Sequence, residues 1–326
     1  MSECVLEEKS AGVIAPELWI CAPSRALMTS ETVPRVDHAR IDAAEAALRA
    51  LGWRVKEAAN VRSLEKSYAG GDAERARGFE EAMCAQGADL VLGLRGGSGA
   101  ARTLEFINWD KVARSQAVFM GLSDLTALNL ALYTKCGKPS WQGPVASAFA
   151  AIDARELDCF ERAMSRPDFE ETVSVNGADF SGSGTLWGGN LSVLTSLIGT
   201  PYFPQIEDGI LYLEDINEPA WRISRMLSQL HLSGVLARQR LVIAGDFAGA
   251  DRGAFGYTLA DAFSVCEAPV VFGLPFGHIR GTMSMPFGVS AQIRVRDQQM
   301  TIRADGCPVP TEHPGAEQAN GPLWWM

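Results

Sequence analysis

The sequence predicts an α/β protein of two domains, and three observations support this fold class. The chain of 326 residues is longer than the roughly 250 to 300 residues that one hydrophobic core usually spans. Its first half alternates short apolar runs with amphipathic helical stretches, which is typical of a parallel sheet covered by helices. Its second half also mixes strands with helices, but less regularly. We therefore divide the chain into residues 1–165 and residues 166–326.

The elements of the first half are predicted from hydrophobic periodicity. Apolar runs at 18–21, 90–94 and 117–120 have the length of buried strands. Between them, one helical face carries Ile41, Ala44, Leu48 and Leu51, and a second carries Ala76, Phe79 and Met83. Residues 150–167 are charged and contain no clear strand, so they predict a polar connecting helix.

The second half predicts five strands and two helices. The strands are expected at 172–175, 184–187, 210–213, 241–244 and 270–273, and the helices at 191–198 and 220–231. After Asp305 the tail contains four prolines, which exclude a regular element. Its closing residues 323–326 are apolar and aromatic, and we expect them to dock on the body of the protein or on a partner subunit.

Composition excludes several classes of function. The net charge is −10, so a nucleic acid backbone would be repelled. Residues 1–9 carry Glu3, Glu7 and Glu8 where a secretory signal would be basic, and no apolar run is long enough to span a membrane. The seven cysteines are scattered and form no CxxC pair, which argues against a disulfide framework or a zinc site. These features predict a cytoplasmic protein.

A serine follows one of the predicted strands at a turn. The apolar run at 117–120 leads into Gly121-Leu122-Ser123-Asp124, and residues 125–133 are helical in pattern. Ligands bind at the carboxyl edge of a parallel sheet, and amides at a helix N-terminus stabilise an oxyanion. Ser123 is therefore a candidate nucleophile. Alternatively it caps the helix, since the full elbow G-x-S-x-G requires glycine where this chain has Leu125.

A second loop at the same predicted edge is rich in glycine. Arg95-Gly96-Gly97-Ser98-Gly99 follows a buried strand, and its glycines allow the backbone to approach a ligand and present its amides. The loop could supply an oxyanion donor, cradle a phosphate or be a flexible turn. The phosphate cradle is discounted, because the spacing of a dinucleotide site and the Lys-Ser/Thr of a P-loop are both absent.

The candidate general base is one of four histidines. His38 lies at a helix start, His231 at a helix end and His313 in the proline-rich tail, where structural or solvated roles suffice. His278 follows a buried strand and a glycine-bearing turn, from which a loop can aim an imidazole.

Two adjacent acids are candidates to orient that histidine. The predicted strand 210–213 ends at Glu214 and Asp215, which point in opposite directions if the strand continues, so that one faces the site and the other solvent. Spacing does not choose between them. A serine, an acid and a histidine in this order match one recurring arrangement of the catalytic triad. In such a triad His278 deprotonates Ser123 and later protonates the leaving amine.

Seven landmarks together resemble the serine LD-carboxypeptidases, a family that includes muramoyltetrapeptide carboxypeptidases and microcin-immunity peptidases. The resemblance covers about residues 18–288. The landmarks are Ala22-Pro23-Ser24, Arg95-Gly96-Gly97-Ser98-Gly99, Gly121-Leu122-Ser123-Asp124, Gly143-Pro144, Gly188-Gly189-Asn190-Leu191, Leu213-Glu214-Asp215 and Pro275-Phe276-Gly277-His278.

The resemblance implies a site and an architecture. It implies Ser123 as nucleophile, Glu214 rather than Asp215 as the orienting acid and His278 as base, with the backbone amides of Gly97 and Asp124 as the oxyanion hole. It also implies a Rossmann-like N-terminal domain, a β-rich C-terminal domain that supplies the acid and the base across a cleft, no metal or cofactor, and a homodimer.

The same resemblance implies a substrate. We expect hydrolysis of the amide that joins a terminal D-alanine to a peptidoglycan-derived tetrapeptide or muropeptide, in cell-wall recycling. One departure is Ser98, where the family commonly has an aromatic residue. The alternative is an immunity-type peptidase that cleaves an aminoacyl- or peptidyl-nucleotide. Trp187 is the candidate platform for the base, but core packing is the favoured interpretation of a tryptophan beside Gly188. The compact segment between Ser123 and Glu214 favours the cell-wall substrate. A noncatalytic small-molecule binding protein is the remaining alternative.

Overall fold

The computed structural model describes residues 15–251 and 256–310. The predictions for residues 1–9, for His313 and for the aromatic tail 323–326 lie outside the described residues. Within the described ranges, no helix is long and apolar enough to cross a membrane.

The first sheet has five parallel strands. They are β1 (Glu17–Cys21), β2 (Arg54–Glu57), β3 (Ala88–Gly93), β4 (Val118–Gly121) and β5 (Ser140–Gln142), in the order β2-β1-β3-β4-β5. The sixth strand, β12 (Met285–Phe287), comes from far along the chain and pairs antiparallel with β5. Because the strand order reverses between β1 and β3, the sheet is doubly wound and its switch point lies between these two strands.

Five α-helices connect these strands. They are α1 (His38–Ala50), α2 (Asp72–Cys84), α3 (Trp109–Ala113), α4 (Thr126–Cys136) and α5 (Ala154–Ser165), joined by the 3₁₀ turns η1 (Ala100–Phe106), η2 (Ser123–Leu125) and η3 (Ala146–Ala151). The predicted apolar faces of α1 and α2 are buried, except that Leu51 lies just beyond the end of α1 and is only partly buried.

Helix α5 is less polar than the sequence suggested. One of its faces is buried through Cys159, Phe160, Ala163 and Met164. The ring of Phe160 packs against Trp53 and Phe149, with centroid distances of 6.5 and 4.9 Å. The helix therefore contributes to the core of the first half as well as connecting the two halves.

The second sheet has eight strands and mixed direction. Its order is β6 (Phe169–Ser174), β14 (Gln299–Ala304), β13 (Val289–Arg296), β8 (Phe180–Asn190), β9 (Gly209–Ile216), β10 (Gln239–Ala248), β11 (Val270–Phe272) and β7 (Asn176–Gly177). Strands β8 to β11 are parallel, and the flanking pairs are antiparallel. The helices of this half are α6 (Leu191–Ser196), α7 (Ala220–Leu232) and α8 (Leu259–Phe263), with the 3₁₀ turn η4 (Leu236–Arg238).

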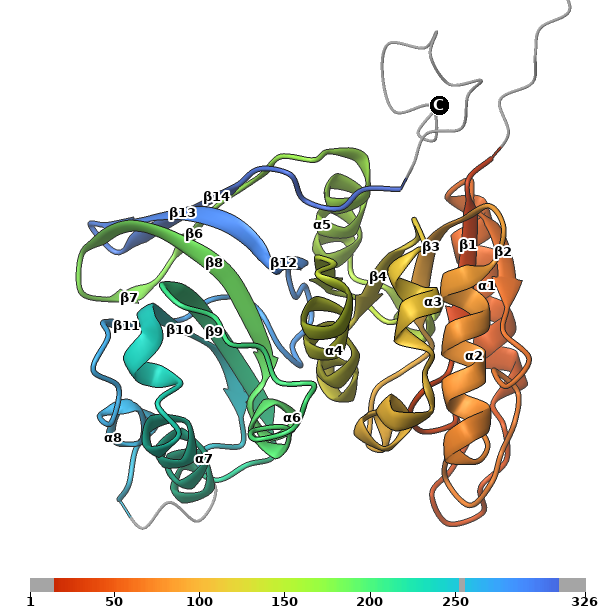
Figure 1. Ribbon diagram of the computed structural model, residues 1–326, viewed down its shortest axis with the longest axis horizontal. Helices are drawn as coiled ribbons and strands as arrows, with labels where there is room; N and C mark the ends of the chain where they lie inside the picture. Colours follow the sequence, from red (N-terminus) through yellow and green to blue (C-terminus); the bar gives the residue numbers. More distant parts are fainter. Residues whose placement is uncertain (1–14, 252–255, 311–326) are drawn as a thin grey trace, which may run out of the picture.

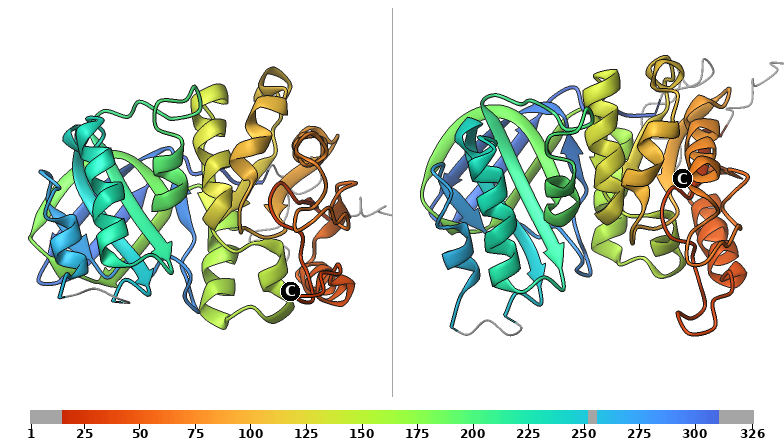
Figure 2. Two further views of the ribbon diagram at one scale, coloured as in Figure 1. Left: turned by 90° about the horizontal axis from the view of Figure 1, so that it is seen from below. Right: turned by 60° about the horizontal axis from the view of Figure 1, so that its bottom comes forward.

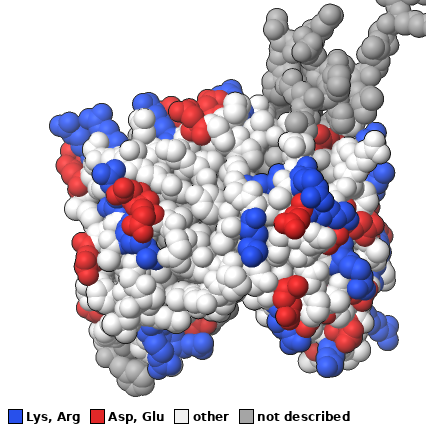
Figure 3. All heavy atoms as spheres, viewed as in Figure 1, with Lys and Arg blue, Asp and Glu red and all other residues white. Residues whose placement is uncertain are grey.

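The two sheets lie side by side with α4 between them (Figures 1 and 2). Helix α4 contacts α6 and β8 of the second half. Basic and acidic side chains are interspersed on the face drawn in Figure 3. The predicted fold class, a parallel-sheet α/β half followed by a β-rich half, is confirmed. The division at residue 165 stays a prediction, and β12 crosses it.

Candidate active site

Ser123 lies at a sharp turn between β4 and α4. Its φ of +66° is in the left-handed region that only glycine adopts freely. The turn continues as η2 and then as α4, so the predicted strand-turn-helix is present. Gly96 packs directly against this serine, because a Cβ at Gly96 would lie 3.0 Å from Ser123 Oγ. The glycine loop therefore lies against the predicted nucleophile.

The two predicted oxyanion donors are free to bind a ligand. Gly97 is exposed and has a φ of +125°, a conformation that suits glycine. Asp124 lies in the first turn of η2. Among the described residues, no protein acceptor binds the backbone N–H of either residue. Unpaired amides beside a serine are what an oxyanion hole requires.

The side chain of Asp124 holds the glycine loop in place. Its Oδ2 accepts a hydrogen bond from Ala100 N at 2.8 Å and lies 2.5 Å from Ser24 Oγ. The same hydroxyl lies 3.1 Å from Ser98 O. Burial raises the pKa of Asp124, while the hydrogen bonds from Ser24 and Ala100 oppose the shift. Three sequence landmarks thus meet at one carboxyl group.

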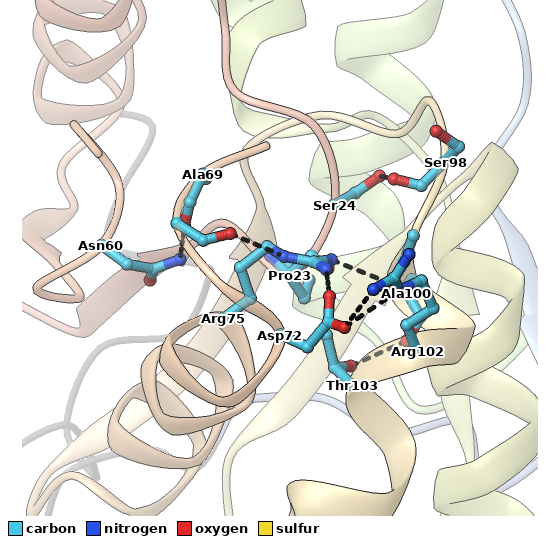
Figure 4. Close-up of polar contacts among 12 residues, drawn as sticks. Pro23, Ser24, Asn60, Ala69, Asp72, Arg75, Ser98, Ala100, Arg102 and Thr103 are labelled. Carbon is cyan, nitrogen blue, oxygen red and sulfur yellow. Dashed lines mark hydrogen bonds and ion pairs between the residues drawn. The ribbon is translucent and has the colours of Figure 1, made fainter. Parts of the chain in front are cut away.

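A buried arginine also holds the glycine loop in place (Figure 4). Arg75 is 0% exposed, and its Nη1 donates to Pro23 O and Gly99 O at 2.8 Å each. Its Nη2 pairs with Asp72, which also binds the exposed Arg102 at 2.6 Å. A buried guanidinium is stable only when its donors are satisfied. Arg75 therefore ties the loop after β1 to the loop after β3.

The second half contributes a histidine and a buried carboxylate. His278 Nδ1 lies 2.7 Å from Glu214 Oε2, and the two side chains are 23% and 0% exposed. Glu214 lies near the end of β9, and His278 lies in the loop after β11. A carboxylate bound to Nδ1 leaves Nε2 available to accept a proton.

The environment shifts the pKa of both groups. Burial raises the pKa of Glu214, and the hydrogen bond from His278 opposes this. Burial lowers the pKa of His278, but the hydrogen bond and charge of Glu214, together with the charges of Asp215 and Asp246, outweigh it, so the net pKa of the histidine is raised. Glu214 therefore stabilises the imidazolium.

Asn190 organises both acids of the pair. Its Nδ2 donates to Glu214 Oε1 and to Asp215 Oδ1, each at 3.1 Å. Asp215 also accepts from Ser192 N at 2.8 Å and is 3% exposed. The expectation that one of the two acids faces solvent is wrong, because the neighbouring helix α6 buries Asp215 and donates the backbone amide of Ser192 to it.

A hydrogen-bond chain joins the two halves near the site. Thr126 Oγ1, at the start of α4, accepts from Asn190 N and from Gln142 Nε2, each at 3.1 Å. Asn190 in turn binds Glu214. No hydrogen bond joins Ser123 to His278 within the described residues. The Glu214–His278 contact is therefore observed, whereas the Ser123–His278 contact and the cleft stay predictions.

Other residues that the sequence singled out lie in structural settings. The ring of His38 lies 3.3 Å from an Arg62 nitrogen, and His231 lies 3.6 Å from Glu267. The side chain of Trp187 is 1% exposed and donates to Gln239 at 2.9 Å. Trp187 therefore belongs to the core, as the packing interpretation predicts, and its ring is not exposed to serve as a platform for a nucleobase.

Sequence reasoning gave no role to four residues that shape the site: Ser24, Arg75, Thr126 and Asn190. Asn190 carried a usable signal, because an asparagine between a strand and a helix is a typical N-cap, and its Oδ1 accepts from Val193 N. Ser24 and Asn190 also stand within the seven landmarks. Arg75 lies within a helix, where arginine is usually exposed, so its burial could not be foreseen.

Comparison with known proteins agrees with this geometry. The N-terminal domain of LD-carboxypeptidases matches residues 19–143, and the C-terminal domain matches residues 183–293. The murein tetrapeptide carboxypeptidase of Pseudomonas aeruginosa is 31% identical to this chain over 271 residues, which are 77% of this chain and 88% of the relative. The microcin C7 self-immunity protein of Escherichia coli is 24% identical over 70% of this chain and 78% of the relative.

A solved structure shares the whole fold. The crystal structure of muramoyltetrapeptide carboxypeptidase from Oxalobacter formigenes matches with a TM-score of 0.81 and 31% identity, covering 90% of this chain and all of that one. Fold and matches together define a two-domain α/β protein of the carboxypeptidase class. More narrowly, the chain belongs to the LD-carboxypeptidase family.

Proposed function

We propose that this protein is a serine LD-carboxypeptidase that removes the C-terminal D-alanine from a peptidoglycan-derived tetrapeptide. One observation carries the proposal: the buried Glu214 carboxylate binds His278 Nδ1 at 2.7 Å in a chain similar to a murein tetrapeptide carboxypeptidase. A histidine held in this way is a general base. The proposal includes a role in cell-wall recycling in the cytoplasm.

The proposed reaction proceeds in two stages. His278 Nε2 takes the proton from Ser123 Oγ as the oxygen attacks the scissile carbonyl carbon, and the amides of Gly97 and Asp124 stabilise the oxyanion. The imidazolium then protonates the leaving D-alanine nitrogen as its C–N bond breaks, which leaves an acyl-enzyme on Ser123. His278 next takes a proton from water as the water oxygen attacks the ester carbon, and it returns that proton to Ser123 Oγ as the ester C–O bond breaks and the shortened peptide leaves. Glu214 holds the ring tautomer and stabilises the imidazolium throughout.

The first experiment measures release of D-alanine by mass spectrometry from L-Ala-D-Glu-meso-diaminopimelate-D-Ala. We expect release by the wild type and its loss in Ser123→Ala, Glu214→Ala and His278→Ala. The matched control is His231→Ala, a histidine at the end of α7 that should keep full activity. Release that persists in Ser123→Ala would show that another group is the nucleophile.

The immunity-type alternative rests on the similarity to the microcin C7 self-immunity protein. It predicts cleavage of an aminoacyl-nucleotide with the tetrapeptide left intact. Burial of Trp187 removes its suggested platform, so we favour the tetrapeptide. If the protein is a noncatalytic binding protein, no serine-reactive probe should label it.

The proposed homodimer is tested by light scattering of the purified chain.

A further inference from the structure

Two arginines lie in the loops on either side of the switch point of the first sheet. Arg25 follows β1 and Arg95 follows β3, and these strands are neighbours at which the strand order reverses. In doubly wound sheets, ligands bind outside the carboxyl ends of the strands at such a point. Both arginines are therefore placed where a ligand is expected.

Arg95 forms no ion pair with an acidic side chain of the described residues. Its Nε donates to Gly96 O at 3.2 Å and its Nη1 to Ala26 O at 3.4 Å. In the described part of the chain, no carboxylate lies within ion-pair distance of it. Burial lowers its pKa, the nearby charges of Arg25 and Arg40 lower it further, and the negative charge of Glu31 opposes them. A partly buried, unpaired guanidinium among other cations favours an anionic ligand.

Arg25 lies over the glycine loop itself. A Cβ at Gly97 would come 2.6 Å from Arg25 Cδ, so the stem of this arginine contacts the loop at the proposed oxyanion donor. Its guanidinium pairs with Glu31 at 2.5 Å, and Glu31 is 62% exposed. Exposed pairs of this kind are weak, so Arg25 can exchange Glu31 for a ligand.

Covalent geometry fixes where the terminal carboxylate of a peptide substrate must lie. Three bonds separate the scissile carbonyl carbon from the carboxylate carbon of the last residue, a span of about 4 Å. The scissile carbon must contact Ser123 Oγ, and Ser123 packs against Gly96. The group that binds the carboxylate therefore has to lie close to Ser123, and the glycine loop is one of the segments placed there.

Three other arginines that could be considered for this role are engaged elsewhere. Arg222, in the helix after Glu214, pairs with Glu218 at 2.8 Å, and Arg225 lies over the ring of Trp221 at 5.0 Å from its centroid. Arg75 has all its bonds within the protein. Arg95, which belongs to the glycine loop and forms no ion pair, is in contrast available to a ligand.

We propose that Arg95, with Arg25 beside it, forms the subsite that binds the C-terminal carboxylate of the peptide substrate. This inference rests on the proposed function and names the feature that makes the enzyme a carboxypeptidase. The subsite supplies a guanidinium that can bind a carboxylate through two nitrogens, one residue away from the glycine that contacts the nucleophile.

The test compares two peptides, the tetrapeptide ending in D-alanine and the same peptide ending in D-alanine amide. We expect the wild type to prefer the acid. Arg95→Gln should lower kcat/KM for the acid about 10- to 100-fold and leave the amide almost unchanged, so that the preference collapses. Arg95→Lys keeps the charge and should retain part of the preference for the acid. Arg114→Gln, an exposed arginine at the end of α3, is the matched control.

The outcomes separate this inference from the proposed function. If Arg95→Gln slows both peptides equally, Arg95 only supports the glycine loop and the subsite is wrong. If the wild type cleaves acid and amide equally, the peptidase stands but the subsite fails. If the wild type cleaves neither peptide, the proposed function fails, and calorimetric binding of the two peptides to Ser123→Ala decides the subsite. A preference for the acid that Arg95→Gln removes supports the subsite. Equal binding of acid and amide overturns the subsite.

Discussion

At the scale of single residues, the strained backbone of Ser123 allows a test of its position. A side chain in the left-handed region costs roughly 1–2 kcal/mol, which glycine avoids at an entropic cost of about 0.5–1 kcal/mol. Both Ser123→Gly and Ser123→Ala remove the hydroxyl and should abolish activity. We expect Ser123→Gly to exceed Ser123→Ala in free energy of unfolding by about 1 kcal/mol, measured by urea denaturation. Equal stabilities would show that the turn is not strained.

The pKa of His278 sets the pH dependence of the proposed reaction. Only the neutral imidazole accepts the proton of Ser123, so activity should rise as pH increases through this pKa. Because Glu214 raises the pKa, the acid limb of kcat/KM should lie above the ordinary histidine value of about 6.5. Glu214→Gln removes the negative charge and should move the limb to lower pH, with kcat reduced at least about 100-fold.

The control for this pH profile is another glutamate. Glu170 forms an exposed pair with Arg303, and Glu170→Gln should leave both the rate and the limb unchanged. A limb that stays in place in Glu214→Gln would mean that the titrating group is not the histidine bound to Glu214.

At the scale of elements, the glycine loop depends on the carboxyl group of Asp124. In the wild type a carboxylate oxygen of Asp124 accepts the hydrogen bond from Ala100 N. Asp124→Asn introduces an amide whose NH₂ group cannot accept this bond when it faces Ala100. The loop and the Gly97 amide should then shift, and a misplacement of about 1 Å can cost about 100-fold in rate. We expect kcat to fall about 10- to 100-fold with KM nearly unchanged.

A companion variant distinguishes this role from general destabilisation. Ser24→Ala leaves Asp124 bonded to Ala100 N and should reduce kcat less than Asp124→Asn does. If both variants lower the melting temperature and kcat in parallel, Asp124 acts through stability alone.

The strands that carry the site could be predicted, because each is a short apolar run with a polar residue at its carboxyl end. β4 and β9 were found in this way. The hairpin of β13 and β14 was missed, although β13 alternates buried and exposed residues along its whole length. Asp297 and Gln298 form its two-residue turn, both with positive φ. The usual sequence signal for such a turn is Asn-Gly, which is absent here, so the turn was not recognised. β12 has only three residues, too few for a periodicity to appear.

The choice between Glu214 and Asp215 shows where local pattern stops being sufficient. Alternation along β9 correctly separates the two side chains, but it does not say what covers each face. Asp215 is buried because α6 begins beside it with Ser192 N and Asn190 as donors. That packing is a tertiary fact, and the resemblance rather than the spacing selected Glu214.

At the scale of the whole molecule, both halves use the same construction. Each sheet has a parallel segment, and the residues of the candidate site lie at or just beyond the carboxyl ends of those strands: Gly97 and Ser123 in one half, Asn190, Glu214 and His278 in the other. Thr126 joins them through Asn190. Because the proposed nucleophile and the proposed base lie in separate halves, the proposed reaction depends on how the halves are held together.

Strand β12 is one of the elements that join the two halves, and it makes the predicted domain boundary testable. Met285, Pro286 and Phe287 cover β5, whose central Trp141 is 0% exposed and donates to Pro308 O at 2.7 Å. A fragment of residues 1–165 lacks this cover. Exposing one such large apolar side chain costs about 3 kcal/mol, a large share of a total stability of about 5–15 kcal/mol.

We therefore expect fragment 1–165 to self-associate through the uncovered edge of β5, and the full chain to unfold in one transition. Light scattering and circular dichroism of the fragment, alone and mixed with fragment 166–326, measure this. Trp141→Phe in the full chain, which loses only the bond to Pro308 O and part of the ring, should fold and serves as the control. A monomeric fragment 1–165 that melts cooperatively would mean that the first half is an independent domain and that β12 only docks on it.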